Sequence, residues 1–226
     1  MSQSSFNRDH FIFHYNVRSL NPIIRLNKQQ DFNTLNIKQP ISTSENISKM
    51  EILKQYIKTL SPGIVGINET WLSKDDQIEF QLFGYKTLET RFTKKKGGVA
   101  LLIHNSIQLE NSKVIEEGRC IQAKVLFENI SFNLIALYAP NKPHQRAEFW
   151  RKITNSQNNQ EPNTVIFGDF NQVEDNQIDR IPIGTNPTQD ELISITNLFK
   201  KLNLIDLGSK GDHTHKHKNG TSRIDR

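Results

Sequence analysis

Three apolar, strand-like segments of this chain each end in Asn or acidic residues. Asn16 closes the first segment, Asn68-Glu69-Thr70 follows the second, and Gly168-Asp169-Phe170-Asn171 follows the third. The ends of neighbouring strands converge at one edge of a sheet, where a rigid scaffold can hold polar side chains for binding or catalysis. Asn, Asp and Gly also favour turns, so any one cluster alone is compatible with an ordinary strand-end turn. Their repetition in three segments indicates a site.

The chemistry of these clusters is that of carboxylate and amide groups. Such a set suits a hard divalent cation such as Mg²⁺, which prefers one or two carboxylates together with waters and substrate phosphate. The remaining carboxylate and amide groups could orient a water for attack on phosphorus. The sequence therefore predicts a metal-dependent site for phosphate esters.

The spacing of apolar residues predicts a mixed α+β domain. Strands are expected over residues 11–15, 64–67, 85–90, 98–103, 121–127, 131–138 and 164–167, and helices over 49–60, 146–155 and 188–202. Tight turns at Glu128-Asn129 and Asn219-Gly220 predict two hairpins, the second within residues 213–225. Because strands outnumber helices, the simplest architecture is a two-layered β-sandwich flanked by helices.

The length of 226 residues favours one domain over residues 11–226, preceded by a disordered tail over residues 1–10. The polar segment Asn21–Ser48 is expected to be a surface insertion, with a functional lid as the alternative. The single cysteine, Cys120, excludes an internal disulfide framework and any Cys-based zinc site. It is expected to be a buried small hydrophobe.

Composition also bears on partners and location. No apolar run approaches the roughly 20 residues that span a bilayer. The N-terminus lacks a hydrophobic signal core, which disfavours secretion. A net charge of +5 is compatible with a polyanionic partner. Trp71 and Trp150 are expected to lie in the core or partly in it, with base stacking as the alternative.

Five motifs occur in a fixed order along nearly the whole chain. They are His14-Tyr15-Asn16-Val17-Arg18-Ser19-Leu20, Ile67-Asn68-Glu69-Thr70-Trp71-Leu72, Leu137-Tyr138-Ala139-Pro140, Gly168-Asp169-Phe170-Asn171 and Thr221-Ser222-Arg223-Ile224-Asp225-Arg226. In this order they resemble the motifs of the endonuclease/exonuclease/phosphatase superfamily. Within it they are similar to the apurinic-endonuclease-like domain of non-LTR retrotransposon proteins, as are Trp71 and the segment Arg91–Ala100.

This resemblance implies a DNase I-like α/β/β/α fold and a Mg²⁺-dependent endonuclease that nicks target DNA, with Mn²⁺ as an alternative metal. A reverse transcriptase domain in a longer polyprotein would then be a partner, no membrane would be involved, and the nucleus would be the location for action on chromosomal DNA. Two other functions stay open. One is an inactive DNA-binding relic, and the other is a phosphoesterase acting on other phosphate esters.

The resemblance also implies roles for single residues. Glu69 is the expected main metal ligand, supported by Asn16. Asp169 would polarise the attacking water, and Asn171 would hold that water and the scissile phosphate. Tyr138 would contact the phosphate, and Asp225 would fix a catalytic histidine. Substrate contacts are expected from Ser222, Thr214, Arg223, Arg91 and Lys95, although a lysine run such as Lys94–Lys96 is equally typical of a solvated turn.

The chain differs in two places from the family that it resembles. The terminal Ser-Asp-His segment, which carries an essential histidine, is absent after Arg226. Arg18 stands where some relatives carry an acidic residue. The expectation is therefore a fragment or degenerate copy that lacks its last strand, and the alternative is that an oligomeric partner supplies the missing edge.

Overall fold

The structure is a computed structural model that describes residues 12–17, 23–24, 47–76, 81–94, 96–158, 163–173, 180–181, 186–206, 215–217 and 220–222. The expected tail, most of the Asn21–Ser48 insertion and four predicted site residues lie outside these ranges. These four residues are Lys95, Thr214, Arg223 and Asp225.

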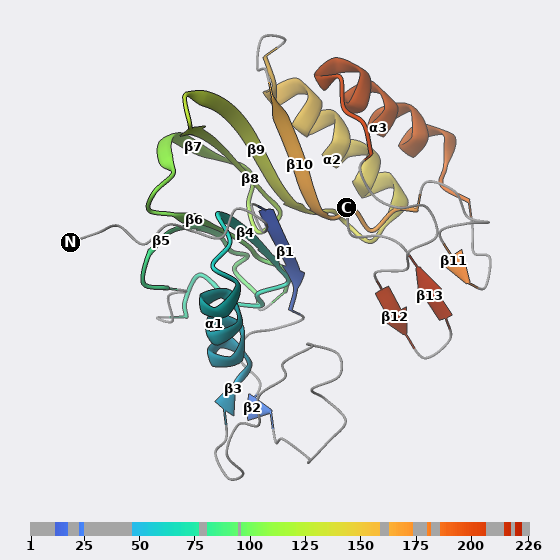
Figure 1. Cartoon of the computed structure of the whole chain (residues 1–226). Helices are drawn as coiled ribbons and strands as arrows, with labels where there is room; N and C mark the ends of the chain where they lie inside the picture. The colour runs from blue at the N-terminus through green and yellow to red at the C-terminus, as the bar shows by residue number, and fades with distance from the viewer. Residues whose placement is uncertain are drawn as a thin grey trace.

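Two mixed four-stranded sheets pack face to face (Figure 1). The first has the order β1-β4-β6-β5 and contains β1 (Ile12–Asn16), β4 (Ile64–Asn68), β5 (Tyr85–Thr90) and β6 (Val99–His104). The second has the order β10-β9-β8-β7 and contains β7 (Gln108–Glu116), β8 (Cys120–Phe127), β9 (Ile130–Tyr138) and β10 (Thr164–Asp169). In each sheet one outer pair is parallel, β1 with β4 and β10 with β9, and the other pairs are antiparallel.

Three helices cover the outer faces of this sandwich. Helix α1 (Lys49–Leu60) packs on the first sheet, and helices α2 (Pro143–Ser156) and α3 (Gln189–Leu202) pack on the second (Figure 1). Thr188, expected to open the last helix, is its N-cap and forms a capping box with Glu191. The layers run helix, sheet, sheet, helix, which confirms the predicted α+β class and sandwich.

Strand alternation divides the apolar side chains among three core layers. The layer between the sheets includes Ile64, Leu101, Leu134, Ala136 and Phe167. The layer under α1 includes Leu53, Ile57, Val65, Ile67 and Leu102. The layer under α2 and α3 includes Cys120, Ile135, Phe149, Trp150 and Leu198, so Cys120 and Trp150 are buried as expected.

One strand of the main sheets was not predicted. Strand β7 is the edge strand of the second sheet, and most of its residues are exposed. Its sequence, QLENSKVIE, has neither an apolar run nor a regular alternation, because little of an exposed edge strand needs to be apolar. Register shifts at Leu109/Asn111 and Val114/Glu116 disturb the alternation further.

Short strands join more distant parts of the chain. Strand β2 (Ile23–Ile24) pairs antiparallel with β3 (Ile47–Ser48), which joins the two ends of the expected insertion. Strands β11 (Arg180–Ile181), β13 (Gly220–Ser222) and β12 (His215–His217) form a small sheet in that order. The antiparallel pairing of β12 with β13 confirms the second predicted hairpin, and β13 contains Ser222. Of the helices in the described part of the chain, none is long and apolar enough to cross a membrane.

Candidate active site

Four strands end at the same rim of the sandwich with polar side chains facing inward. In β1 and β4, Asn16 and Asn68 are register partners and lie on the face that points towards the second sheet. In β10 and β9, Asp169 and Tyr138 are register partners and lie on the face that points towards the first. Alternate residues of a strand share one face, and each of the four lies two or four residues after a side chain of the core between the sheets. Those core side chains are Ile12, Ile64, Phe167 and Ala136. Local strand geometry thus directs all four side chains into one opening.

The amide of Asn16 joins the two predicted carboxylates across the sheets. Its Nδ2 donates to Glu69 Oε1 at 2.9 Å and to Asp169 Oδ2 at 2.9 Å. Asp169 is only 2% exposed. The structure therefore brings together three residues that are widely separated in the sequence and that the sequence placed at a metal site.

Asn16 Oδ1 is buried and has no hydrogen-bond partner among the described residues. An unpaired buried carbonyl oxygen is costly, so it points to a ligand that the side chain is built to receive. Amide and carboxylate oxygens such as those of Asn16 and Glu69 are the ligands that Mg²⁺ takes, completed by waters and substrate phosphate. No group of three or more His, Cys, Asp or Glu that could hold a metal occurs within the described ranges. Amide and carboxylate oxygens suit a hard cation, whereas zinc-type sites mostly use Cys or His ligands.

The loop that carries Glu69 is held by a glycine pair. Glu69 and Trp71 have positive φ angles of 55° and 52°. The N–H of Trp71 donates to the carbonyl of Gly97 at 2.8 Å, and the N–H of Thr70 donates to that of Gly98 at 3.4 Å. Gly98 has a φ of +90°, and a Cβ there would lie 2.2 Å from Thr70 Oγ1. Only glycine allows this approach, so the Gly97-Gly98 pair sets the position of Glu69.

Asn171 lies beside Asp169 in a tight turn. It has a φ of 48°, its backbone N–H donates to Asp169 Oδ1 at 2.8 Å, and its side-chain Nδ2 donates to the carbonyl of Ala139 at 2.7 Å. Gly168 precedes this turn with a φ of +140°, and a Cβ there would lie 2.0 Å from the carbonyl oxygen of Leu137. The Gly-Asp-Phe-Asn motif is therefore a close-packed strand end.

Tyr138 lies close to both carboxylates. Burial raises the pKa of Tyr138 to about 12, and the negative charges of Glu69 and Asp169 act in the same direction. The positive charge of Arg119 and the neighbouring Asn141 amide oppose this rise in the pKa. The phenol is therefore a neutral hydrogen-bond donor at neutral pH, suited to a phosphate oxygen.

Arg119 supports Tyr138 and was not found from the sequence. Its guanidinium lies 5.4 Å from the ring centroid of Tyr138 and 5.2 Å from that of Phe92, and it donates to the Tyr138 carbonyl at 3.1 Å. Burial lowers the pKa of Arg119. The contacts join three separate segments, so no local sequence signal marks this residue.

His14 lies beneath the site, on the same face of β1 as Asn16. Burial of the imidazole lowers its pKa to about 4, which the Asn68 side chain only partly offsets. The imidazole is thus neutral at neutral pH.

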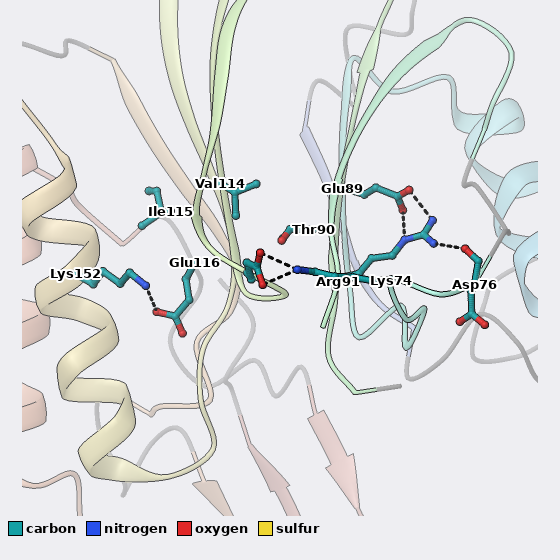
Figure 2. Close-up of a pocket in the computed structure, with 10 residues that line it drawn as sticks. Lys74, Asp76, Glu89, Thr90, Arg91, Val114, Ile115, Glu116 and Lys152 are labelled. Atoms are coloured by element: carbon teal, nitrogen blue, oxygen red, sulfur yellow. Dashed lines mark hydrogen bonds and ion pairs between the residues drawn. The ribbon is translucent and has the colours of Figure 1, made fainter. Parts of the chain in front are cut away.

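Arg91 is held by neighbouring protein groups. It forms an ion pair with Glu89 at 2.6 Å and donates to the carbonyls of Ser73 and Asp76. Arg91 lines a cavity of about 720 Å³ that two further ion pairs also line, Lys74–Glu117 and Lys152–Glu116 (Figure 2). The four inward residues at the strand ends do not line this cavity. The structure thus gives Arg91 a structural role and does not bring it together with Asn16, Glu69 and Asp169.

Trp71 is 40% exposed, whereas Trp150 is completely buried. The indole Nε1–H of Trp71 donates to Glu69 Oε2 at 3.2 Å, so the ring lies at the opening of the site. The backbone hydrogen bonds from Thr70 and Trp71 to Gly98 and Gly97 hold the loop so that the ring points outwards.

Solved structures that share this fold include two AP endonucleases and the endonuclease domain of a retrotransposon. The AP endonuclease from Archaeoglobus fulgidus is 16% identical with a TM-score of 0.50, over 67% of this chain and 65% of that one. The APE2 catalytic domain of Xenopus laevis is 18% identical with a TM-score of 0.51, over 66% of this chain and 62% of that one. The endonuclease domain of TRAS1, a telomere-specific non-LTR retrotransposon, is 12% identical with a TM-score of 0.55, over 76% of this chain and 75% of that one.

These likenesses confirm the expected DNase I-like arrangement of the fold. The chain covers less than two thirds of the length of either AP endonuclease. No protein with a curated description matches the chain by sequence. Residues 13–226 match the Endonuclease/Exonuclease/phosphatase family, and with almost the whole chain matched, the protein belongs to that family.

Proposed function

We propose that this chain is a Mg²⁺-dependent DNA endonuclease domain that hydrolyses a phosphodiester to nick its target. The observation that carries the proposal is the bridge from Asn16 to both Glu69 and Asp169, because it gathers two carboxylates and an unpaired amide oxygen at one opening. Members of this family generally depend on a divalent metal, which agrees with that donor set.

Each residue of the opening has a role that its contacts support. Glu69 and Asn16 Oδ1 would hold the cation, which neutralises charge that develops on the scissile phosphate. Asp169 accepts two hydrogen bonds from protein donors, and these keep its carboxylate oriented to take a proton from the attacking water. Tyr138 would donate a hydrogen bond from its phenol to a phosphate oxygen, and Asn171, held by its bonds to Asp169 and Ala139, would position the water and the phosphate.

DNA is the proposed substrate, and a retrotransposon the proposed context. The neighbours described as AP endonucleases and as the endonuclease domain of a non-LTR retrotransposon support both. In that context the nick would supply a 3′ hydroxyl to a reverse transcriptase domain of the same polyprotein. Action on chromosomal DNA would place the protein in the nucleus.

Nicking of supercoiled plasmid in Mg²⁺, with EDTA as the blank, tests the proposal. Asp169→Asn and Glu69→Gln are each expected to lower the nicking rate by at least roughly 100-fold. The matched controls Asp190→Asn and Glu128→Gln change exposed residues away from the opening and are expected to leave the rate unchanged.

Three outcomes would contradict the proposal in different ways. A wild-type protein that neither nicks nor gains thermal stability from Mg²⁺ has neither the activity nor the metal site. Salt-dependent binding to duplex DNA without any product would favour the inactive relic. Faster turnover of small phosphate esters than of DNA would favour the phosphoesterase alternative.

A further inference from the structure

Trp71 is exposed between two buried neighbours in its loop. Thr70 before it is 2% exposed and Leu72 after it is 0% exposed, whereas Trp71 is 40% exposed. The other tryptophan, Trp150, is completely buried and donates its indole N–H to Gln172 at 3.0 Å. Exposure alone does not mark a site, since Phe83 is 95% exposed, but Trp71 is exposed between two buried neighbours and beside Glu69, which leaves its ring available to a ligand there.

The ring is also held rigidly. The φ of 52° at Trp71 is unusual for a large side chain, and the backbone N–H is tied to the carbonyl of Gly97 at 2.8 Å. The indole N–H is tied to Glu69 Oε2 at 3.2 Å. Backbone strain of this kind clusters at functional sites, where the surrounding structure maintains it. A ring fixed in advance loses little conformational entropy when a ligand stacks on it.

The anchor places the ring beside the proposed chemistry. Glu69 accepts from Trp71 through one carboxylate oxygen and from Asn16 through the other. A phosphodiester held at Asn16, Glu69 and Asp169 would therefore have its neighbouring nucleotides next to the indole. The polar edge of the ring is already paired with Glu69, so the apolar face is the part left to a ligand.

We propose that Trp71 is a stacking platform for an unpaired nucleobase next to the scissile phosphate, an inference that rests on the proposed nuclease function. Stacking of this kind tolerates any base sequence, because every base presents a π-face. The ligand class is thus single-stranded or locally unpaired nucleic acid, and Trp71 acts through the base while the strand-end residues act on the phosphate.

Intrinsic fluorescence tests the contact directly, since the chain has only two tryptophans and Trp150 is completely buried. The probes are an oligothymidylate and a polymer of equal length and charge that carries tetrahydrofuran residues in place of bases. Without divalent metal, so that no strand is cut, the oligothymidylate is expected to quench the fluorescence of Trp71. The base-free polymer is expected not to.

A pair of variants separates the ring from the indole N–H. Trp71→Phe and Trp71→Leu both lose the donor to Glu69, but only Phe keeps an aromatic face. We expect Trp71→Leu to weaken oligothymidylate binding, followed by anisotropy of a labelled probe, by roughly 5- to 100-fold. Trp71→Phe should retain most of the affinity, and all three proteins should bind the base-free polymer equally within about twofold.

The outcomes distinguish this inference from the proposed function. A wild-type protein that nicks plasmid, while the two variants bind both probes alike, would overturn the stacking role and leave the nuclease intact. Quenching of equal size by the base-free polymer would also overturn it. A wild-type protein that neither nicks plasmid nor binds either probe would overturn the nuclease function together with this inference.

Discussion

Asn16 and Asp169 lie 153 residues apart in the sequence, yet the amide of Asn16 donates to the carboxylate of Asp169 at 2.9 Å. The two residues end the parallel-paired outer strands of different sheets, so this hydrogen bond joins the halves of the sandwich at the opening. The same amide reaches Glu69, so one neutral side chain separates two negative ones. The site and the alignment of the two sheets therefore depend on the same contact.

Asn16→Asp should destabilise the metal-free protein. The substitution preserves shape but replaces the amide donor with a third carboxylate facing Glu69 and Asp169, and like charges at this distance repel. We expect the Tm without divalent metal to fall by roughly 5 °C. Added Mg²⁺ should raise the Tm of the variant more than that of the wild type. Asn129→Asp, the same change in an exposed hairpin turn, should shift the Tm little. Equal shifts in Tm for the two variants would contradict the placement of Asn16 between the carboxylates of Glu69 and Asp169.

Gly98→Ala should displace Glu69, and Gly84→Ala is its matched control. Both glycines have a φ of +90°, but a Cβ at Gly98 meets Thr70 Oγ1 at 2.2 Å, whereas at Gly84 its nearest neighbour is His104 Nε2 at 3.9 Å. The control should therefore cost only the backbone penalty, about 1–2 kcal/mol of unfolding free energy. Gly98→Ala should cost more in urea denaturation and should also abolish the Mg²⁺-linked rise in Tm. Equal costs, with metal binding intact in both, would show that the glycine pair does not position Glu69.

Arg119→Met should slow nicking through Tyr138. The guanidinium that lies over the Tyr138 ring and bonds its carbonyl would be lost, and small displacements of a positioned group are costly to catalysis. We expect a fall in kcat of roughly 10- to 100-fold. Arg151→Met, on the outer face of α2, should leave kcat unchanged. Arg119→Lys keeps the positive charge but loses the planar group that stacks on the Tyr138 ring. If this variant has the kcat of the wild type, the charge of Arg119 alone supports Tyr138.

The elements that the sequence predicted best are those with local signals. The spacing of Met50, Leu53, Ile57 and Leu60, followed by Ser61-Pro62-Gly63, gave both ends of α1. The apolar run of β4 and its polar end placed Asn68 and Glu69 correctly, because burial and strand termination are both visible in neighbouring residues. The convergence of Asn16, Glu69 and Asp169 followed from strand ends alone.

The features that the sequence did not reveal depend on distant contacts. Trp71 is exposed because Gly97 and Gly98 hold its loop, and an apolar side chain taken alone predicts burial. Arg91 has its charge paired by Glu89, where a basic run suggests phosphate binding. Arg119 gains its role only when Phe92 and Tyr138 meet on either side of it. Such roles arise from packing between elements, which spacing within one element does not encode.

Tyr85→Phe should change how stability depends on pH at the alkaline end. Burial raises the pKa of Tyr85 to about 12, and its O–H donates to the Pro62 carbonyl at 2.6 Å. In the unfolded chain the phenol ionises near pH 10, so the stabilisation is complete below pH 10 and is lost as the pH rises towards 12. At pH 8 the variant should therefore be less stable by about 1 kcal/mol, the net value of one hydrogen bond. Urea denaturation at pH 8, 9, 10 and 11 measures this difference in unfolding free energy. It should shrink above pH 10, because the wild type loses stability there as Tyr85 ionises in the unfolded chain, whereas Phe cannot ionise. A difference that stays constant would mean that the Tyr85 phenol has the same pKa in the folded and unfolded states.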